Sequence, residues 1–286
     1  MVLENLISEN NFKQIKLRIL IVSFVYTIFA ILMSFFFFNN LNISFVTLSF
    51  ISLFILSTFG NMFKLSISPE ISKFNKNIKL SLMFYELRKK LIIFLMIFFG
   101  VFLGFVIFSF TTPIEYNANF FSAQSDLIYT EDVSNMYKNM NLETLFINNL
   151  QIILLSILTS FLFGIGTVFL YLIIWNASVA AIIFMEVSKS SSLLYDLNFL
   201  IIFLIIFFSV LPHLILEIIS YLLGGLIGEN FSSYVVAKKP SGFKYKKIIF
   251  FTASLFTYAL LILFLGALIE VYLPNNMIVF LLNLFI

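Results

Sequence analysis

Two ionisable side chains lie inside an otherwise apolar stretch, Leu194–Gly228, and they are the residues best suited to chemistry. His213 is the only histidine of the chain, and Glu217 follows it by four residues. This spacing places both on one face of a helix, within reach of each other across one turn. Pro212 precedes them, and a proline removes a backbone donor and clashes one turn back, which predicts a kink or a break between two half-length helices.

This pair has more than one potential use. It could bind a proton, hold a cation, or satisfy the backbone that Pro212 frees. Ionisable groups in hydrocarbon are costly and by default mark a functional site, but the structural use stays open as an alternative. Asn176, at the end of an earlier apolar run, allows the same two interpretations, because an unwound backbone there would need partners. We take His213, Glu217, Asn176 and Pro212 as the candidate intramembrane polar site.

The sequence argues against an enzyme. One histidine is too few for a histidine-rich zinc site, and the HExxH motif is absent. There is no cysteine, no GxSxG elbow and no Walker or dinucleotide-binding fingerprint. We therefore expect no enzymatic activity, no metal, no cofactor and no nucleic-acid partner.

The composition is that of a membrane protein. The 286 residues are 61% hydrophobic and only 11% charged, with a mean hydropathy of +1.07. Several apolar runs reach the roughly 20 residues that cross a bilayer as a helix. We predict an all-α, polytopic transmembrane bundle with broken or re-entrant helices, forming one integral domain, 1–286, in the plasma membrane.

We expect seven crossings, with five as the main alternative. Val179–Val187 is too short to span and is expected to be re-entrant or interfacial. Pro274 is expected to end the last span, and the tail Met277–Ile286 to lie at the interface. The predicted spans are Ile19–Phe38, Ile43–Gly60, Leu91–Phe110, Asn148–Trp175, Asn198–Leu211, His213–Gly228 and Ile248–Tyr272.

The connecting segments differ in charge. We expect residues 1–17 to form an interfacial segment. Residues 61–90 are predicted to form a basic amphipathic loop with a helix that begins at Ser68-Pro69-Glu70. This helix is expected to lie on lipid headgroups or, alternatively, to bind a partner. Three basic residues precede the first span, seven lie in 61–90 and five in 238–247, so 15 of 17 fall in segments that can share one side. The positive-inside rule makes those segments cytoplasmic, with the N-terminus, and places the acidic loop 111–147 outside.

Glycines mark the faces where helices can approach closely. Gly100 and Gly104, like Gly224 and Gly228, have the small-xxx-small spacing. We expect them to support packing and self-association into a homo-oligomer. The full set of predicted packing glycines is Gly100, Gly104, Gly164, Gly166, Gly224, Gly225 and Gly228.

Five motifs lie between residues 145 and 230: Asn148-Asn149, Gly164-x-Gly166-Thr167, Asn176, Pro212-His213-x-x-x-Glu217 and Gly224-Gly225-x-x-Gly228. With these motifs, the region resembles the stage II sporulation protein M family of integral membrane proteins. Leu214 and Ala177 stand where the family usually has glycine. The resemblance implies a membrane scaffold that recruits peptidoglycan-degrading partners during engulfment in spore formers.

Two functions therefore follow from the sequence. The first is a non-enzymatic membrane scaffold, with lipids as partners and a membrane or extracellular protein bound through residues 111–147. The alternative is a small-solute or ion transporter or channel that uses the polar site near Pro212.

Overall fold

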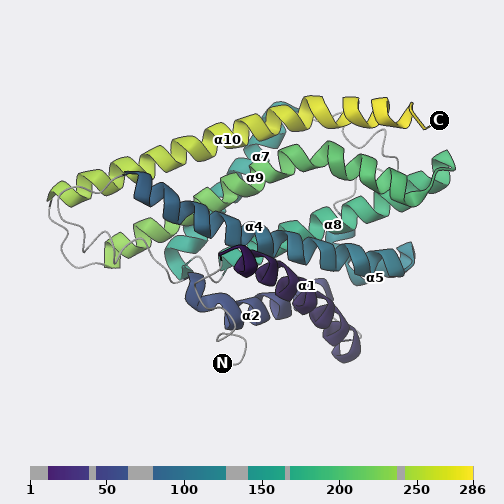
Figure 1. Cartoon of the computed structure of the whole chain (residues 1–286), viewed down its shortest axis with the longest axis horizontal. Helices are drawn as coiled ribbons and strands as arrows, with labels where there is room; N and C mark the ends of the chain where they lie inside the picture. The colour runs from purple at the N-terminus through teal and green to yellow at the C-terminus, as the bar shows by residue number, and fades with distance from the viewer. Residues whose placement is uncertain are drawn as a thin grey trace.

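The chain folds as a bundle of long helices (Figure 1). The structure is a computed structural model that describes residues 12–38, 43–63, 80–126, 141–164, 168–236 and 242–285. Within these ranges all regular structure is helical, which confirms the all-α prediction. The helices are α1 (Phe12–Phe37), α2 (Ile43–Phe63), α4 (Leu80–Thr111), α5 (Ile114–Phe120), α6 (Ser122–Ser125), α7 (Leu142–Phe163), α8 (Val168–Tyr195), α9 (Phe199–Val236) and α10 (Gly242–Leu282).

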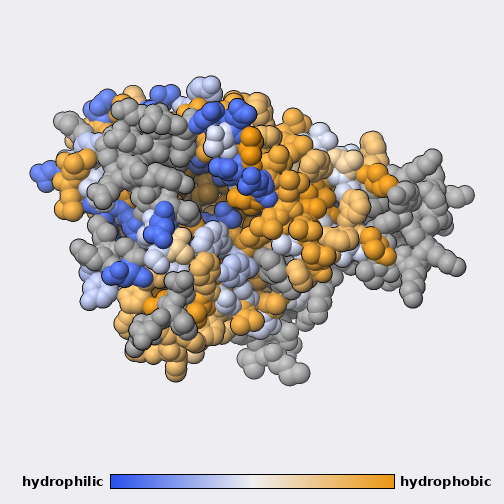
Figure 2. All heavy atoms as spheres, turned by 180° about the vertical axis from the view of Figure 1, so that it is seen from behind, coloured by the Kyte–Doolittle hydropathy of each residue, from blue (hydrophilic) through white to orange (hydrophobic). Residues whose placement is uncertain are grey.

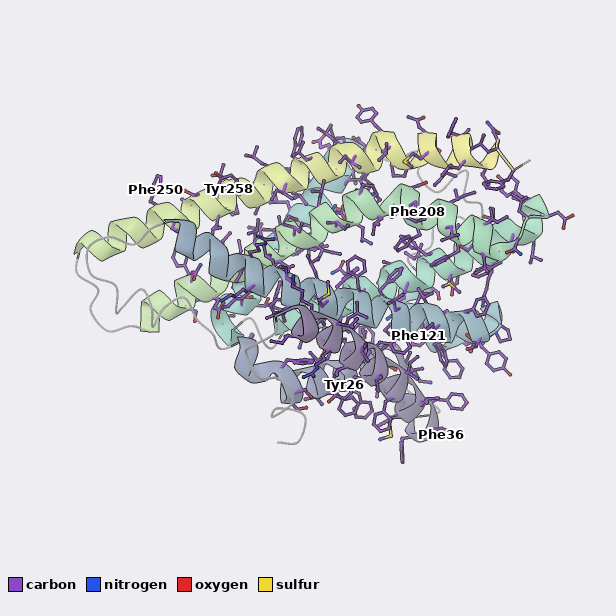
Figure 3. The ribbon with its side chains drawn as sticks, viewed as in Figure 1. Tyr26, Phe36, Phe121, Phe208, Phe250 and Tyr258 are labelled. Carbon is purple, nitrogen blue, oxygen red and sulfur yellow. The ribbon has the colours of Figure 1, made fainter. Side chains whose placement is uncertain are left out.

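Seven of these described helices, all except the short α5 and α6, are long and apolar enough to cross a membrane. Apolar side chains cover much of the surface between the two ends of the molecule (Figure 2). Phe250, which is 69% exposed, and Tyr258 lie along α10 (Figure 3). An apolar outer surface of this kind suits contact with acyl chains, so the chain is a multi-pass membrane protein.

Aromatic side chains of α4 fill the centre of the bundle. Phe98 and Phe102 are buried and stack on each other, with ring centroids 6.4 Å apart. Phe102 also meets Phe184 of α8 edge to face and contacts Phe207 of α9. Such aromatic pairs add to the stability gained from burial, and they fix α4 against the helices that carry the polar residues.

The small-xxx-small glycines pack helices of the same chain. A Cβ at Gly100 would lie 2.5 Å from the carbonyl oxygen of Leu20 in α1, and one at Gly104 would lie 2.6 Å from Thr27. Gly228 approaches the backbone of α7 in the same way. These faces are occupied within one molecule, so they are not available for the self-association that the sequence analysis assigned to them.

The predicted break at Pro212 is not present, because α9 runs without interruption from Phe199 to Val236. A proline in a helix costs one hydrogen bond and a local clash. Buried residues on both sides, Val210 and Ile218 among them, hold the two halves in the bundle. Packing by neighbouring helices lets a membrane helix continue through a proline.

The real break lies in the predicted span Asn148–Trp175. Gly164 has φ +80°, a conformation that favours glycine, and it separates α7 from α8. Val179–Val187 is consequently an internal part of α8 and is not re-entrant. The described residues still contain seven candidate spans, as expected. However, residues 142–195 provide two of them where one was predicted, and residues 199–232 provide one where two were predicted.

Pro274 does not end the last helix either. Helix α10 continues to Leu282, so most of the predicted interfacial tail is helical. Ile278 and Leu282 are buried in the bundle, and their burial offsets the hydrogen bond lost at the proline.

The order of the helices fits the predicted orientation. The starts of α4 and α10 and the end of α9 lie together at one end, on the left of Figure 1, which we call the basic-loop end. The ends of α4, α8 and α10 lie at the other, the acidic-loop end. The predicted amphipathic helix from Ser68, and residues 1–11 of the predicted interfacial segment, lie outside the described residues.

A short segment after α4 folds back onto the bundle at the acidic-loop end. Phe121, between α5 and α6, packs edge to face on Phe105 and Phe108 of α4, with centroids 5.2 and 5.9 Å apart (Figure 3). The hydroxyl of Ser44 in α2 donates to the Phe120 carbonyl at 3.1 Å. The first part of the predicted polar loop is therefore docked on three helices, since α6 also packs on α8.

Candidate intramembrane site

Three helices, α7, α9 and α10, meet closely enough to bring polar side chains together. A Cβ at Gly224 of α9 would lie 3.1 Å from the carbonyl oxygen of Ile153 in α7. On the other side, a Cβ at Gly266 of α10 would lie 3.6 Å from the Glu217 Cγ. Glycine removes the side chains that would otherwise keep these backbones apart, so Glu217 lies between α7 and α10.

A chain of hydrogen bonds joins Glu217 to α7. The Asn149 Nδ2 donates to the Glu217 Oε1 at 2.6 Å. The Tyr221 hydroxyl, one turn after Glu217, donates to the Asn149 Oδ1 at 2.7 Å. Tyr221 is only 3% exposed. The phenol therefore orients the amide, and the amide uses one of its two N–H groups to orient one oxygen of Glu217.

The second partner of Glu217 is another carboxyl. Glu270 follows Gly266 by one turn of α10, on the face that packs against Glu217, and the two carboxyls are within hydrogen-bonding reach. Glu270 is 9% exposed, and its Oε2 has no hydrogen-bond partner among the described residues. Ionised carboxylates only accept hydrogen bonds, so a bond between these two groups requires a proton.

The residues proposed from sequence are distributed differently. His213 lies in α9 one turn before Glu217 and is buried, with 3% exposure. The partners that orient Glu217 come instead from α7 and α10. The Asn176 Nδ2 donates to the Leu172 carbonyl of its own helix at 2.8 Å, so this side chain serves α8. Pro212 lies within the continuous α9.

The remaining predicted glycines have separate roles. A Cβ at Gly225 would lie 2.8 Å from the ring of Phe169 in α8, so this glycine allows α8 and α9 to pack. Gly164 forms the turn after α7, and a Cβ there would meet no atom within 4 Å. Gly166 lies outside the described residues.

Asn149 and Glu270 are site residues that the sequence analysis missed. Asn149 entered it only through the Asn148-Asn149 motif at the start of an apolar run, and Glu270 is an acidic residue inside the last predicted span, Ile248–Tyr272. An ionisable residue inside a span is the signal that selected Glu217. Applied to every span, the same rule selects Glu270 as well.

A second polar cluster lies where α6 meets α8. The Ser125 hydroxyl donates to the Glu186 Oε1 at 2.8 Å, and the Gln124 Nε2 donates to the Ser178 hydroxyl at 3.1 Å. The Lys189 ammonium donates to the carbonyls of Ser109 and Thr112, at the end of α4. A cation at a helix C-terminus satisfies carbonyls that have no partner in the helix. This cluster fastens the α5–α6 segment to the bundle.

Neither polar cluster has the composition of a metal site. In the ranges that the structure describes, no group of three or more histidine, aspartate or glutamate side chains is placed to hold a metal ion. The central group consists of two carboxyls, an amide and a phenol, all joined by hydrogen bonds. These groups can accept and donate hydrogen bonds.

These features define an integral membrane protein whose described residues include seven long apolar helices and a buried carboxyl pair. The chain belongs to the Stage II sporulation protein M family, whose profile matches residues 89–274, well over half of its length. The match confirms the suspected family and extends beyond residues 145–230 to include α4 and Glu270. Comparisons with curated proteins and with solved structures gave no match.

Proposed function

We propose that this protein is a non-enzymatic scaffold of the plasma membrane that holds a protein partner through its acidic loop, 111–147. The observation that supports this function is the docking of the α5–α6 segment. Phe121 anchors the segment on α4, while Ser125 and Gln124 bind α8. The segment is the first part of that loop and directly follows α4.

The far end of the loop is also held. The Asn141 side chain accepts from the Glu143 amide at 3.0 Å and so caps the first turn of α7. Both ends of residues 127–140 are thus attached to secondary structure. Fixed ends reduce the conformational freedom that a binding segment must lose when a partner docks.

The charge of the loop suggests the chemistry of the partner. Residues 111–147 contain five acidic residues and one lysine, a balance of four negative charges. The acidic residues are Glu115, Asp126, Glu131, Asp132 and Glu143. A basic surface on a membrane or extracellular protein would complement this charge, and the association would weaken as salt rises.

The test is capture of partners by the full-length protein in its native membrane. Replacing the five acidic residues by Asn or Gln should remove a partner that wild-type protein retains, with unchanged abundance in the membrane. The matched variant Asp196→Asn removes an exposed acidic side chain outside the loop and should retain that partner. Identical partners for wild type and the loop variant would contradict the proposal.

A transporter or channel is the second candidate, because the Glu217–Glu270 pair lies within membrane-spanning helices. Purified protein in liposomes should then accumulate an ion or solute, and Glu217→Gln should abolish the uptake. Absence of flux in wild-type liposomes, together with loop-dependent partner capture, would favour the scaffold.

A homo-oligomer remains a prediction for either function. Gly100, Gly104 and Gly228 face α1 and α7 of the same chain, so any self-association would use other surfaces. Cross-linking of the purified protein in detergent tests this point.

A further inference from the structure

We propose that Glu217 and Glu270 form an exchangeable proton-binding site inside the membrane, in which the two carboxyls share one proton. The two groups come from different helices: Gly266 of α10 packs on the Glu217 side chain, and Glu270 follows Gly266 by one helical turn on the same face. Both carboxyls are thus directed into the contact between α9 and α10, within hydrogen-bonding reach of each other. This site is independent of the scaffold function proposed above, and its test does not require a partner protein.

The neighbouring donors cannot supply the proton. One N–H of Asn149 is used on the Glu217 Oε1. The single O–H of Tyr221 is donated to the Asn149 Oδ1 and is not available to either carboxyl. The bond between Glu217 and Glu270 therefore needs a proton carried by one of the carboxyls.

Glu270 has further acceptor capacity. Its Oε2 is buried without a partner among the described residues. Its main-chain carbonyl also lacks the usual helical donor, because the residue four positions later is Pro274. A buried polar atom without a partner is costly. The Glu270 Oε2 and its main-chain carbonyl oxygen can therefore accept hydrogen bonds from a water molecule that delivers the proton to the pair.

The titratable groups around the pair are few. Tyr221 interacts with both carboxyls through charge, and His213 lies one turn from Glu217 on α9. Helix α7 contributes the neutral Asn149, and α10 contributes Glu270. In the described residues, no ion pair with lysine or arginine joins either carboxyl. The charge of the pair is therefore set chiefly by the proton.

A proton suits this geometry better than a metal ion. Calcium and magnesium take six or more oxygen ligands, whereas a proton needs only two acceptors. Two carboxyls in hydrogen-bond contact already have the arrangement that a shared proton requires. Release is balanced simply: the O–H bond breaks, the proton passes to water, and the pair gains one negative charge.

A hydrophobic carbodiimide provides the test, because it reacts with carboxyls in their protonated form. Full-length protein in liposomes would be treated at neutral pH and analysed by peptide mass spectrometry. We expect modification of Glu217 or Glu270 and none of Glu143, an exposed carboxyl in the first turn of α7. Modification should decline as the buffer becomes alkaline. No modification of either residue at neutral pH would overturn the proposal.

Two variants separate a shared proton from mere burial. In Glu217→Gln, the amide can donate to Glu270, which no longer has a neighbouring carboxyl to share a proton with. Because Glu270 stays buried in this variant, a fall in its labelling at neutral pH reports loss of the shared proton and not a change in burial. Unchanged labelling of Glu270 would contradict sharing. Glu270→Gln is the reciprocal variant and should lower labelling of Glu217.

The proposal remains testable if these variants do not fold. An infrared difference spectrum of wild-type protein between acidic and alkaline buffers should show loss of a protonated-carboxyl band from a water-inaccessible site. The band should be absent from the difference spectrum if the pair holds no exchangeable proton, and that result would also overturn the proposal.

Discussion

Lys90 and Glu229 form a buried ion pair that joins the start of α4 to the end of α9. The Lys90 Nζ lies 2.7 Å from the Glu229 Oε2, and the two side chains are 6% and 13% exposed. The residues are far apart in sequence, so this contact closes the basic-loop end of the bundle. A buried pair of this kind is costly to break, because one charge is then left without its partner.

The first prediction concerns this pair. Lys90→Ala should lower the free energy of unfolding by about 3–5 kcal/mol, since it leaves the Glu229 carboxylate uncompensated. Thermal unfolding of the purified protein in detergent measures the change. The double variant Lys90→Met with Glu229→Met should recover most of the loss. Arg88→Ala, at an exposed neighbouring position, is the control, and an equal effect in both single variants would contradict the prediction.

The second prediction concerns the packing of α7 on α9. A Cβ at Gly228 would lie 2.1 Å from the Ile157 carbonyl oxygen and 2.9 Å from the Phe161 nitrogen. Backbone atoms cannot move aside cheaply, so Gly228→Ala should separate the two helices and strongly reduce the yield of folded protein. Size-exclusion chromatography and thermal unfolding measure this outcome.

Gly60→Ala is the matched control for the second prediction. A Cβ there would meet only the flexible end of Leu56, at 3.6 Å. Because alanine favours a helix over glycine, this variant should be neutral or more stable by about 0.5–1 kcal/mol. If both glycine variants behave alike, the close approach of α7 and α9 is wrong.

The third prediction concerns the cap that Lys189 provides to α4. Lys189→Met removes the donor to the Ser109 and Thr112 carbonyls and should cost about 1–3 kcal/mol. It should also loosen α6. The chain has no cysteine, so a Gln124→Cys reporter, buried in the docked segment, should react faster with a thiol reagent in the Lys189→Met background. Lys189→Arg keeps a donor and should leave the rate nearly unchanged.

The fourth prediction concerns Pro212. Because α9 is continuous, Pro212→Ala can restore the amide that the proline lacks and should leave unfolding unchanged or raise the midpoint temperature. Circular dichroism during heating measures this. A marked destabilisation would show that the proline is needed for the shape of α9.

Hydropathy was enough to predict the helical class and the first three spans. The number of candidate spans also agrees with the seven expected, although the middle ones are divided at other residues than predicted. Apolar length dominates in a membrane, since every backbone polar group must be bonded within a helix. Local rules failed at Pro212 and Pro274, where packing of the flanking residues outweighs the loss of one hydrogen bond. The same rules did not predict that a helix ends at Gly164, because that end depends on the positive φ of this glycine.

The polar site was predictable only in part. Glu217 stood out because it is ionisable within an apolar run. Its partner Asn149 lies 68 residues earlier in the chain. Its partner Glu270 lies later in the chain, on another helix. Which helices meet is decided by the fit of side chains, here by Gly224 and Gly266. A single sequence carries no direct signal for contacts between helices. The pairing of Glu217 with His213 could be proposed because the spacing of four residues within one helix is visible in the sequence.

The seven candidate spans of the described chain are an odd number, which has a practical consequence. Fusion tags placed before α1 and after α10 would be delivered to different compartments. The two halves of a split fluorescent reporter, one at each end, should therefore never reassemble on a single molecule, and a reporter that matures only in the cytoplasm should glow at just one of the two ends.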